Sequence, residues 1–118
     1  MRILFCGDRN WSKYSTIREE LKKLNPKEDI IIEGCAKGAD SIAGWLAEQM
    51  GFKVEKYPAQ WEIYGKAAGP IRNQQMLDEG KPDLVLAFHE NIEASRGTRD
   101  MVTRATKAGI KVEIFDGK

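Results

Sequence analysis

Five short apolar segments alternate along this chain with stretches of helical periodicity, and this alternation constrains the fold more than any other feature. The segment Asp29–Glu33 holds three consecutive isoleucines, which is typical of a strand covered on both faces. Further strands are expected at Arg2–Cys6, Phe52–Tyr57, Asp83–Phe88 and Ile110–Phe115. Because strands separated by helices cannot be joined by tight hairpins, the sheet should be mainly parallel.

Helices are expected in the four intervals between these strands. The predicted ranges are Tyr14–Leu24, Ala39–Met50, Lys66–Glu79 and Gly97–Ala108. Pro70 lies inside the third range, so the regular helix should begin at Pro70, after a polar and aromatic loop that starts at Ala59. With right-handed crossovers, this order predicts an α/β, Rossmann-like three-layer sandwich: a mainly parallel five-stranded sheet with helices on both faces.

The length and composition limit the class of protein. A chain of 118 residues is expected to form a single domain, 1–118. Its 19 basic and 18 acidic side chains leave a net charge of +1, which argues against a nucleic-acid backbone as the partner. One His and two Cys cannot supply four zinc ligands, and no apolar run approaches the roughly 20 residues that cross a bilayer. We therefore expect a cytoplasmic protein with no metal, cofactor or membrane partner.

The segment Gly34–Asp40 joins a predicted strand to a predicted helix with small residues and one lysine. In a parallel sheet this turn lies at the carboxyl edge, where ligands of such folds bind. Small residues let backbone N–H groups approach an anion, and the start of the helix adds the positive end of its dipole. The alternative is a tight turn in which Asp40 is only a favourable charge in the first helical turn. The segment lacks the Gly-Lys-Ser/Thr ending of a P-loop.

Two more segments at the same predicted edge carry residues suited to an anion. Gly97-Thr98 opens the last helix with a glycine and a hydroxyl, although an ordinary capping turn explains this pattern as well. Arg72 can bind a phosphate in a bidentate manner, and Asn73 can bind a base or sugar edge. The alternative for Arg72 is a surface salt bridge, the usual role of an arginine on a helix.

Five aromatic side chains lie outside the predicted strands, and one of them, Tyr14, belongs to the apolar spacing of the first predicted helix. Trp61 and Tyr64 fall in the predicted loop after the third strand, where they could stack on a base. Trp11 is expected to cover the core, and Trp45 is expected to pack within the protein from the second helix.

The residues that could act as nucleophiles offer no catalytic arrangement. Cys6 and Cys35 follow neighbouring strands and are expected to be buried free thiols. His89, the one histidine, is expected to be a loop residue, and no Ser-His-Asp spacing is present.

Taken together, these segments resemble the YspA-like branch of the SLOG (Smf/DprA–LOG) superfamily. The resemblance covers essentially the whole chain and rests on Gly7–Trp11, Gly34–Asp40, Pro58–Trp61, Tyr64–Asn73 with Met76, Asp83–Phe88, and Gly97-Thr98 with Met101-Val102. It implies a Rossmann-like fold that binds nucleotides or nucleotide-derived ligands, with relatives that often form homodimers or larger homo-oligomers. Carried over by motif, the ligand contacts would be Gly7, Arg9, Gly34, Ala36, Gly38, Ala39, Asp40, Arg72, Asn73, Gly97 and Thr98.

One departure concerns the superfamily members that cleave nucleoside monophosphates at the N-glycosidic bond. Those members carry Pro-Gly-Gly-x-Gly-Thr followed by paired glutamates. Here the first two glycines are absent before Gly97, Asp100 stands at one glutamate position and Met101 stands at the other. Because aspartate is one methylene shorter than glutamate, this pattern favours binding over hydrolysis.

Three functional hypotheses follow from the resemblance and the residues. The first is a protein that binds a nucleotide or nucleotide-derived small molecule, such as a signalling nucleotide, for sensing or sequestration, with Trp61 or Tyr64 covering the base. The second is a phosphoribohydrolase of nucleoside 5′-monophosphates, in which Asp100 is the catalytic carboxylate and Arg72 holds the phosphate. The third is a single-stranded nucleic-acid module, which the net charge of +1 makes the weakest.

Overall fold

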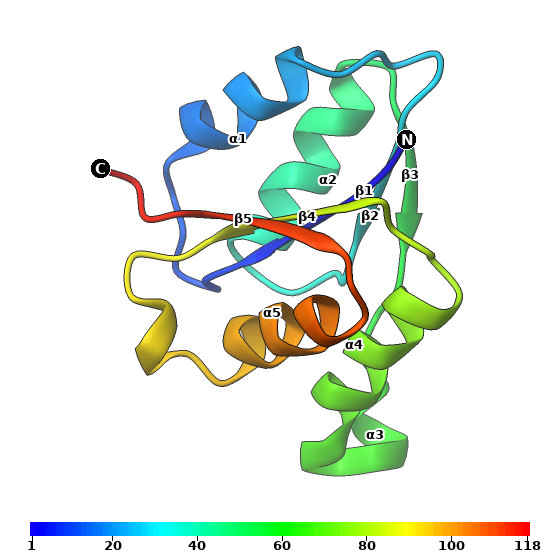
Figure 1. The fold of residues 1–118 in the computed structure, drawn as a ribbon, viewed down its shortest axis with the longest axis vertical. Coiled ribbons are helices and arrows are strands. Elements are labelled where there is room, and N and C mark those ends of the chain that lie inside the picture. Colours follow the sequence, from blue (N-terminus) through cyan, green and yellow to red (C-terminus); the bar gives the residue numbers. More distant parts are fainter.

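The computed structural model describes residues 1–118 and contains one five-stranded sheet in which every neighbouring pair of strands is parallel (Figure 1). The strands are β1 (Arg2–Gly7), β2 (Ile30–Glu33), β3 (Lys53–Lys56), β4 (Leu84–Phe88) and β5 (Lys111–Phe115). Their order across the sheet is β3-β2-β1-β4-β5, so β1 and β4 are neighbours although β2 and β3 lie between them in the chain. The sheet is doubly wound and Rossmann-like, as the alternation of elements predicts, and the structure supplies the order of its strands.

Helices cover both faces of the sheet and complete the three predicted layers. They are α1 (Tyr14–Lys22), α2 (Ala39–Gln49), α3 (Trp61–Tyr64), α4 (Ala68–Asp78) and α5 (Gly97–Lys107), with the 3-10 helices η1 (Gly65–Ala67) and η2 (Ile92–Ala94). Figure 1 shows α1 and α2 above the sheet and α4 and α5 below it, with α3 at the lower end of the molecule. None of these helices has the length and apolar character needed to cross a membrane.

The core forms two layers because successive side chains of a strand point to opposite faces of the sheet. On the α1/α2 face, Ile3, Phe5 and Ile31 pack with apolar residues of both helices. On the α4/α5 face, Leu4 and Ile32 pack with the methionines of those helices. These strand residues are completely buried, as expected for a parallel sheet with helices on both faces.

The third crossover differs from its prediction, while the other predicted ranges agree with the structure within two residues. Trp61–Tyr64 is a single helical turn rather than a loop, and η1 leads from it into α4 without an extended segment. Gly65 separates the two helices with φ of 56°, a left-handed conformation that glycine adopts easily. The regular helix begins at Ala68 instead of Pro70, because proline is tolerated throughout the first turn, where N–H groups have no intrahelical acceptor.

Three predictions about burial are wrong, and one of them concerns Ala108, which was expected to face inward from the last helix and is exposed. Trp45 is 57% exposed rather than packed inside, because Ile42 and Leu46 occupy the inward side of α2. Cys35 is also exposed, since it lies in the turn after β2 with φ of 63° and not in the strand itself. Cys6 is a buried free thiol, as predicted.

Candidate functional site

The carboxyl ends of β1 and β4 mark the point where the winding of the sheet reverses. The chain leaves β1 toward α1 on one face and leaves β4 toward α5 on the other (Figure 1). In folds of this kind the crevice outside the strand ends at this point is the usual ligand site. The segments after β1, β2 and β4 therefore define the candidate site.

Two glycines let these segments pack directly on each other. Gly38 has φ of 76°, and a side chain there would overlap the backbone of Asp8 and Arg9. A side chain at Gly7 would overlap the carbonyl group of Phe88 and lie 2.8 Å from the Cβ of Ala39. Hydrogen bonds fix the same arrangement: Ala39 N–H donates to the Asp8 carbonyl at 3.1 Å, and Asp8 N–H donates to the Phe88 carbonyl at 2.8 Å. The internal packing of the protein thus requires both glycines.

Asp40 belongs to the first turn of α2, and its side chain is buried against the β2–α2 turn (residues 34–38). Its residue is only 4% exposed, and its Oδ2 accepts hydrogen bonds from the N–H groups of Gly34 at 3.2 Å and Ala36 at 3.4 Å. Burial raises the pKa of Asp40 to about 7, while the nearby Arg72 guanidinium acts in the opposite direction. The N–H groups of Gly34 and Ala36 are therefore engaged within the chain, and their contact with a ligand stays a prediction.

Arg72 projects from α4 toward the same turn. Its Nη1 donates to the Gly34 carbonyl, and its Nε donates to the Oδ1 of Asn73 at 3.2 Å. A Cβ atom at Gly34 would lie 2.5 Å from Nη1 of Arg72 and 2.9 Å from Oδ2 of Asp40. Glycine at this position therefore allows the guanidinium and the buried carboxyl group to approach the turn from two sides.

Asn73 extends this network to α5. It is buried, and its Nδ2 donates to the Gly97 carbonyl at 3.3 Å and to Oδ2 of Asp100 at 2.9 Å. The same oxygen of Asp100 accepts a hydrogen bond from Nε of Arg104 at 2.8 Å. A continuous set of polar contacts thus joins the β2–α2 turn, α4 and the first turn of α5. The structure in this way brings Gly34, Asp40, Arg72, Asn73, Gly97 and Asp100 together at one edge of the sheet.

Gly97 differs from every other glycine of the chain. It has no positive φ, and a Cβ atom built on it would have no neighbour within 4 Å. In the turn that it opens, Thr98 N–H donates to Oγ of Ser95 and Asp100 N–H donates to the Arg96 carbonyl, both at 3.0 Å. The N–H groups of Gly97 and Arg99 have no acceptor within the chain. Neither packing nor backbone conformation requires glycine here, and the space beside it is open.

The predicted stacking residues Trp61 and Tyr64 lie on α3, and their side chains form no hydrogen bond with this network. Both are exposed, Trp61 by 59% and Tyr64 by 46%. Tyr64 lines a hollow of about 620 Å³ along α4, together with Gln74 and Arg104. Neither Gly34 nor Gly97 lines that hollow.

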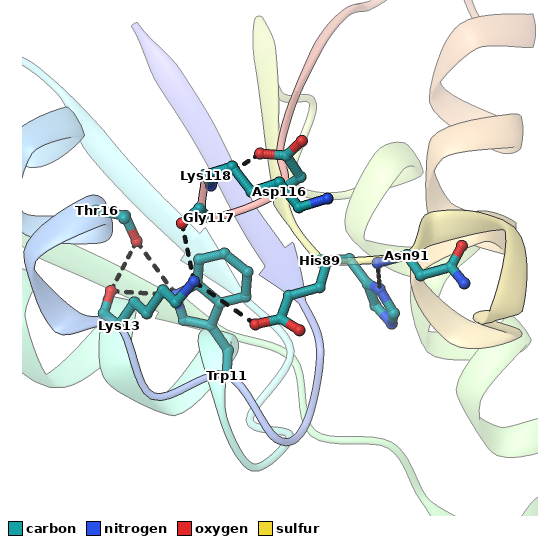
Figure 2. Close-up of polar contacts among 9 residues, drawn as sticks. Trp11, Lys13, Thr16, His89, Asn91, Asp116, Gly117 and Lys118 are labelled. Carbon is teal, nitrogen blue, oxygen red and sulfur yellow. Dashed lines mark hydrogen bonds and ion pairs between the residues drawn. The ribbon is translucent and has the colours of Figure 1, made fainter.

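Trp11 covers the core, as predicted. Its ring meets Phe88 edge-on at 5.8 Å between centroids, and its Nε1 donates to the Lys13 carbonyl and to Oγ1 of Thr16 (Figure 2). Lys13 in turn donates from Nζ to the Gly117 carbonyl at 2.8 Å, and this hydrogen bond joins the C-terminal segment to the loop after β1 (Figure 2).

His89 is the loop residue that the sequence predicts. It directly follows β4, and its Nδ1 accepts a hydrogen bond from the Asn91 N–H at 2.9 Å (Figure 2).

Two residues of the site were not predicted from the sequence. Arg104 holds Asp100 and also donates from Nη1 to Oε1 of Gln74 at 2.9 Å. Its spacing of four residues from Asp100 on one helix was the available signal. Glu33 is buried at the end of β2, where its Oε1 accepts the N–H of Cys35, and burial raises its pKa. A polar residue that closes an all-apolar strand was the only sign of it.

Comparisons with known proteins identify the family of this chain. The model of the YspA, cpYpsA-related SLOG family matches residues 1–64. The Gene 61 protein of Mycobacterium phage D29 is 39% identical over 125 residues, an alignment that covers 99% of this chain and 98% of the phage protein. The X-ray structure of DNA processing protein A (DprA) from Streptococcus pneumoniae has the same fold, with a TM-score of 0.80 at 22% identity. That match covers 99% of this chain, which spans half the length of the DprA chain. The chain therefore belongs to the YspA, cpYpsA-related SLOG family.

Proposed function

We propose that this protein binds a nucleotide or nucleotide-derived small molecule at the carboxyl edge of its sheet. Membership of the SLOG family and the position of the polar network at the β1/β4 winding reversal support this function. The observation that carries the proposal is the open space beside Gly97, a glycine that neither backbone conformation nor packing requires. Glycine has no Cβ atom, so the backbone at this position allows close approach of a ligand.

The surroundings of Gly97 suit a phosphate group. The unpaired N–H groups of Gly97 and Arg99 can donate to phosphate oxygens, and the helix dipole of α5 favours a negative charge at this end. Arg72 is anchored at the Gly34 carbonyl and supplies a positive charge nearby. Asn73 fixes the start of α5 relative to α4, so these donors are held in place before a ligand arrives.

Isothermal titration calorimetry with mono-, di- and cyclic nucleotides tests the proposal on two matched variants. Gly97→Val puts a branched side chain into the open space without a clash inside the protein, so the fold should persist while nucleotide affinity falls about tenfold or more, that is by at least ~1.4 kcal/mol. Ala108→Val adds similar bulk at the exposed opposite end of α5 and should leave affinity unchanged. Absence of binding by the folded wild-type protein to every nucleotide refutes the proposal, as does full affinity in Gly97→Val.

Hydrolysis of a nucleoside 5′-monophosphate is the second candidate, and the position of Asp100 favours it. The Asp100 carboxylate lies in the first turn of α5, three residues from Gly97, and two donors hold its Oδ2 in place. A carboxylate fixed in this way can stabilise an oxocarbenium-like centre. Binding remains the leading proposal because it needs only the donors described above and not a reactive carboxylate.

Single-stranded nucleic-acid binding receives less support. The name of the DprA structure refers to DNA processing, but at 22% identity that match concerns the fold alone. A net charge of +1 provides little electrostatic attraction to a phosphate backbone. Self-association likewise stays a prediction, for which the exposed Trp61 and Ile63 on α3 are candidate contacts.

A further inference from the structure

A second hollow lies on the α1/α2 face of the sheet, opposite the hollow along α4. It measures about 400 Å³ and lies between the loop after β1 and the first two turns of α2. Tyr14 and Trp45 line it from different helices, and they are 46% and 57% exposed. A volume of this size is within the range of small-molecule sites in proteins.

The exposure of Trp45 has no explanation in the packing of the protein. Its neighbours Ile42 and Leu46 turn inward into the core, and the indole ring remains in water beside the hollow. Tyr14 adds a second exposed ring from the start of α1. Two exposed aromatic rings at one hollow provide surfaces on which a planar ring can stack.

The charge of this hollow favours an anionic ligand. Arg9 is its one charged lining side chain, and no carboxylate faces it. The larger hollow along α4 is different, because Asp78 and Glu79 outnumber the single Arg104 there. An aromatic ligand that carries phosphate is therefore better suited to the hollow beside Trp45 than to the one beside Tyr64.

The hollow shares Gly38 with the β2–α2 turn of the candidate site. Gly38 lines it and packs against the backbone of Arg9, and Gly34, at the start of the same turn, binds Arg72 through its carbonyl. A ligand with its anionic group near this turn can therefore extend a ring toward α2.

The geometry points to this hollow as the base subsite of the nucleotide site, with the nucleobase stacked on Trp45 and Tyr14 and with Arg9 attracting the phosphate side. This inference rests on the proposed nucleotide binding and specifies where the base lies. It places the base against α2, whereas the sequence-based hypothesis placed it against Trp61 and Tyr64 of α3.

The two exposed tryptophans provide a matched test. Calorimetry with AMP, GMP, CMP and UMP, and with ribose 5-phosphate as a probe without a base, is carried out on wild type, Trp45→Ala, Tyr14→Ala and Trp61→Ala. Trp45→Ala should weaken binding of the preferred nucleotide roughly 5- to 150-fold and leave that of ribose 5-phosphate unchanged. Trp45→Phe should restore much of the lost affinity, because a phenyl ring still stacks. Trp61→Ala should bind like wild type.

Each of the other possible calorimetric results contradicts either the base subsite or the proposed function. If wild type binds a nucleotide and both Trp45→Ala and Tyr14→Ala retain full affinity, the base lies elsewhere and this inference alone fails. Loss of affinity in Trp61→Ala instead would return the base to α3. If ribose 5-phosphate binds as tightly as every nucleotide, no base subsite exists. If the folded wild type binds no nucleotide at all, the proposed function fails together with this inference.

Discussion

The buried carboxyl group of Asp40 should make the stability of this protein depend on pH in an unusual direction. Burial raises the pKa of Asp40 from its ordinary value of 3.8 to about 7 in the folded protein. The folded state therefore binds a proton between these two values that the unfolded chain releases. For an acid with a raised pKa, the free energy of unfolding is highest at low pH and falls as pH rises toward the folded pKa. At about 1.4 kcal/mol per pKa unit, the loss between pH 5 and pH 8 is about 2.5 kcal/mol.

Asp40→Asn isolates this contribution, because asparagine keeps an acceptor oxygen for the N–H groups of Gly34 and Ala36 and carries no charge. Urea unfolding at pH 5 and pH 8 should show a fall in stability for wild type that is larger by about 2.5 kcal/mol than the fall for the variant. Some fall should remain in Asp40→Asn, since burial also raises the pKa of Glu33. Asp78→Asn changes an exposed carboxylate and should behave like wild type. Identical pH dependence in wild type and Asp40→Asn would refute the reasoning.

Two further predictions separate packing from function. Gly38→Ala should lower the free energy of unfolding by about 2–4 kcal/mol, because the new side chain overlaps the backbone of Asp8 and Arg9 and the alanine must adopt a positive φ. Chemical denaturation measures the change. A loss below ~0.5 kcal/mol would contradict the described packing. If the protein hydrolyses nucleoside monophosphates, Asp100→Asn should reduce release of free base at least about 100-fold, while Asn73 still holds the first turn of α5. Chromatography of the reaction mixture detects the base. Unchanged turnover would exclude Asp100 as the catalytic carboxylate.

The layers and the parallel sheet were predictable because they depend on the periodicity and alternation of the elements, whereas the order of the strands was not predicted. Ile30–Ile32 are three adjacent β-branched residues, and a helix on either side is the arrangement that covers both of their faces. On α5, Met101 and Ala105 are four residues apart and completely buried, as their spacing predicts. Strand or helix character of this kind is a local property, and the spacing of apolar residues along the chain indicates it.

The features that sequence reasoning missed depend on contacts between distant segments. Nothing near Asp40 in the sequence indicates that its carboxyl group folds back onto Gly34 and lies opposite an arginine of α4. The exposure of Trp45 was missed because its neighbours alone decide which side of α2 faces the core. The short helix α3 was missed because four residues are too few to show helical periodicity.

The location of the ligand can be measured directly by nitrogen-15 NMR during titration with the nucleotide that binds best in calorimetry. Ligand binding at the β1/β4 edge predicts the largest shifts for the backbone amides of Gly97 and Arg99, together with Gly38 in the adjoining turn. Shifts confined to α3 or β5, with the Gly97 amide unmoved at saturation, would contradict the proposed site.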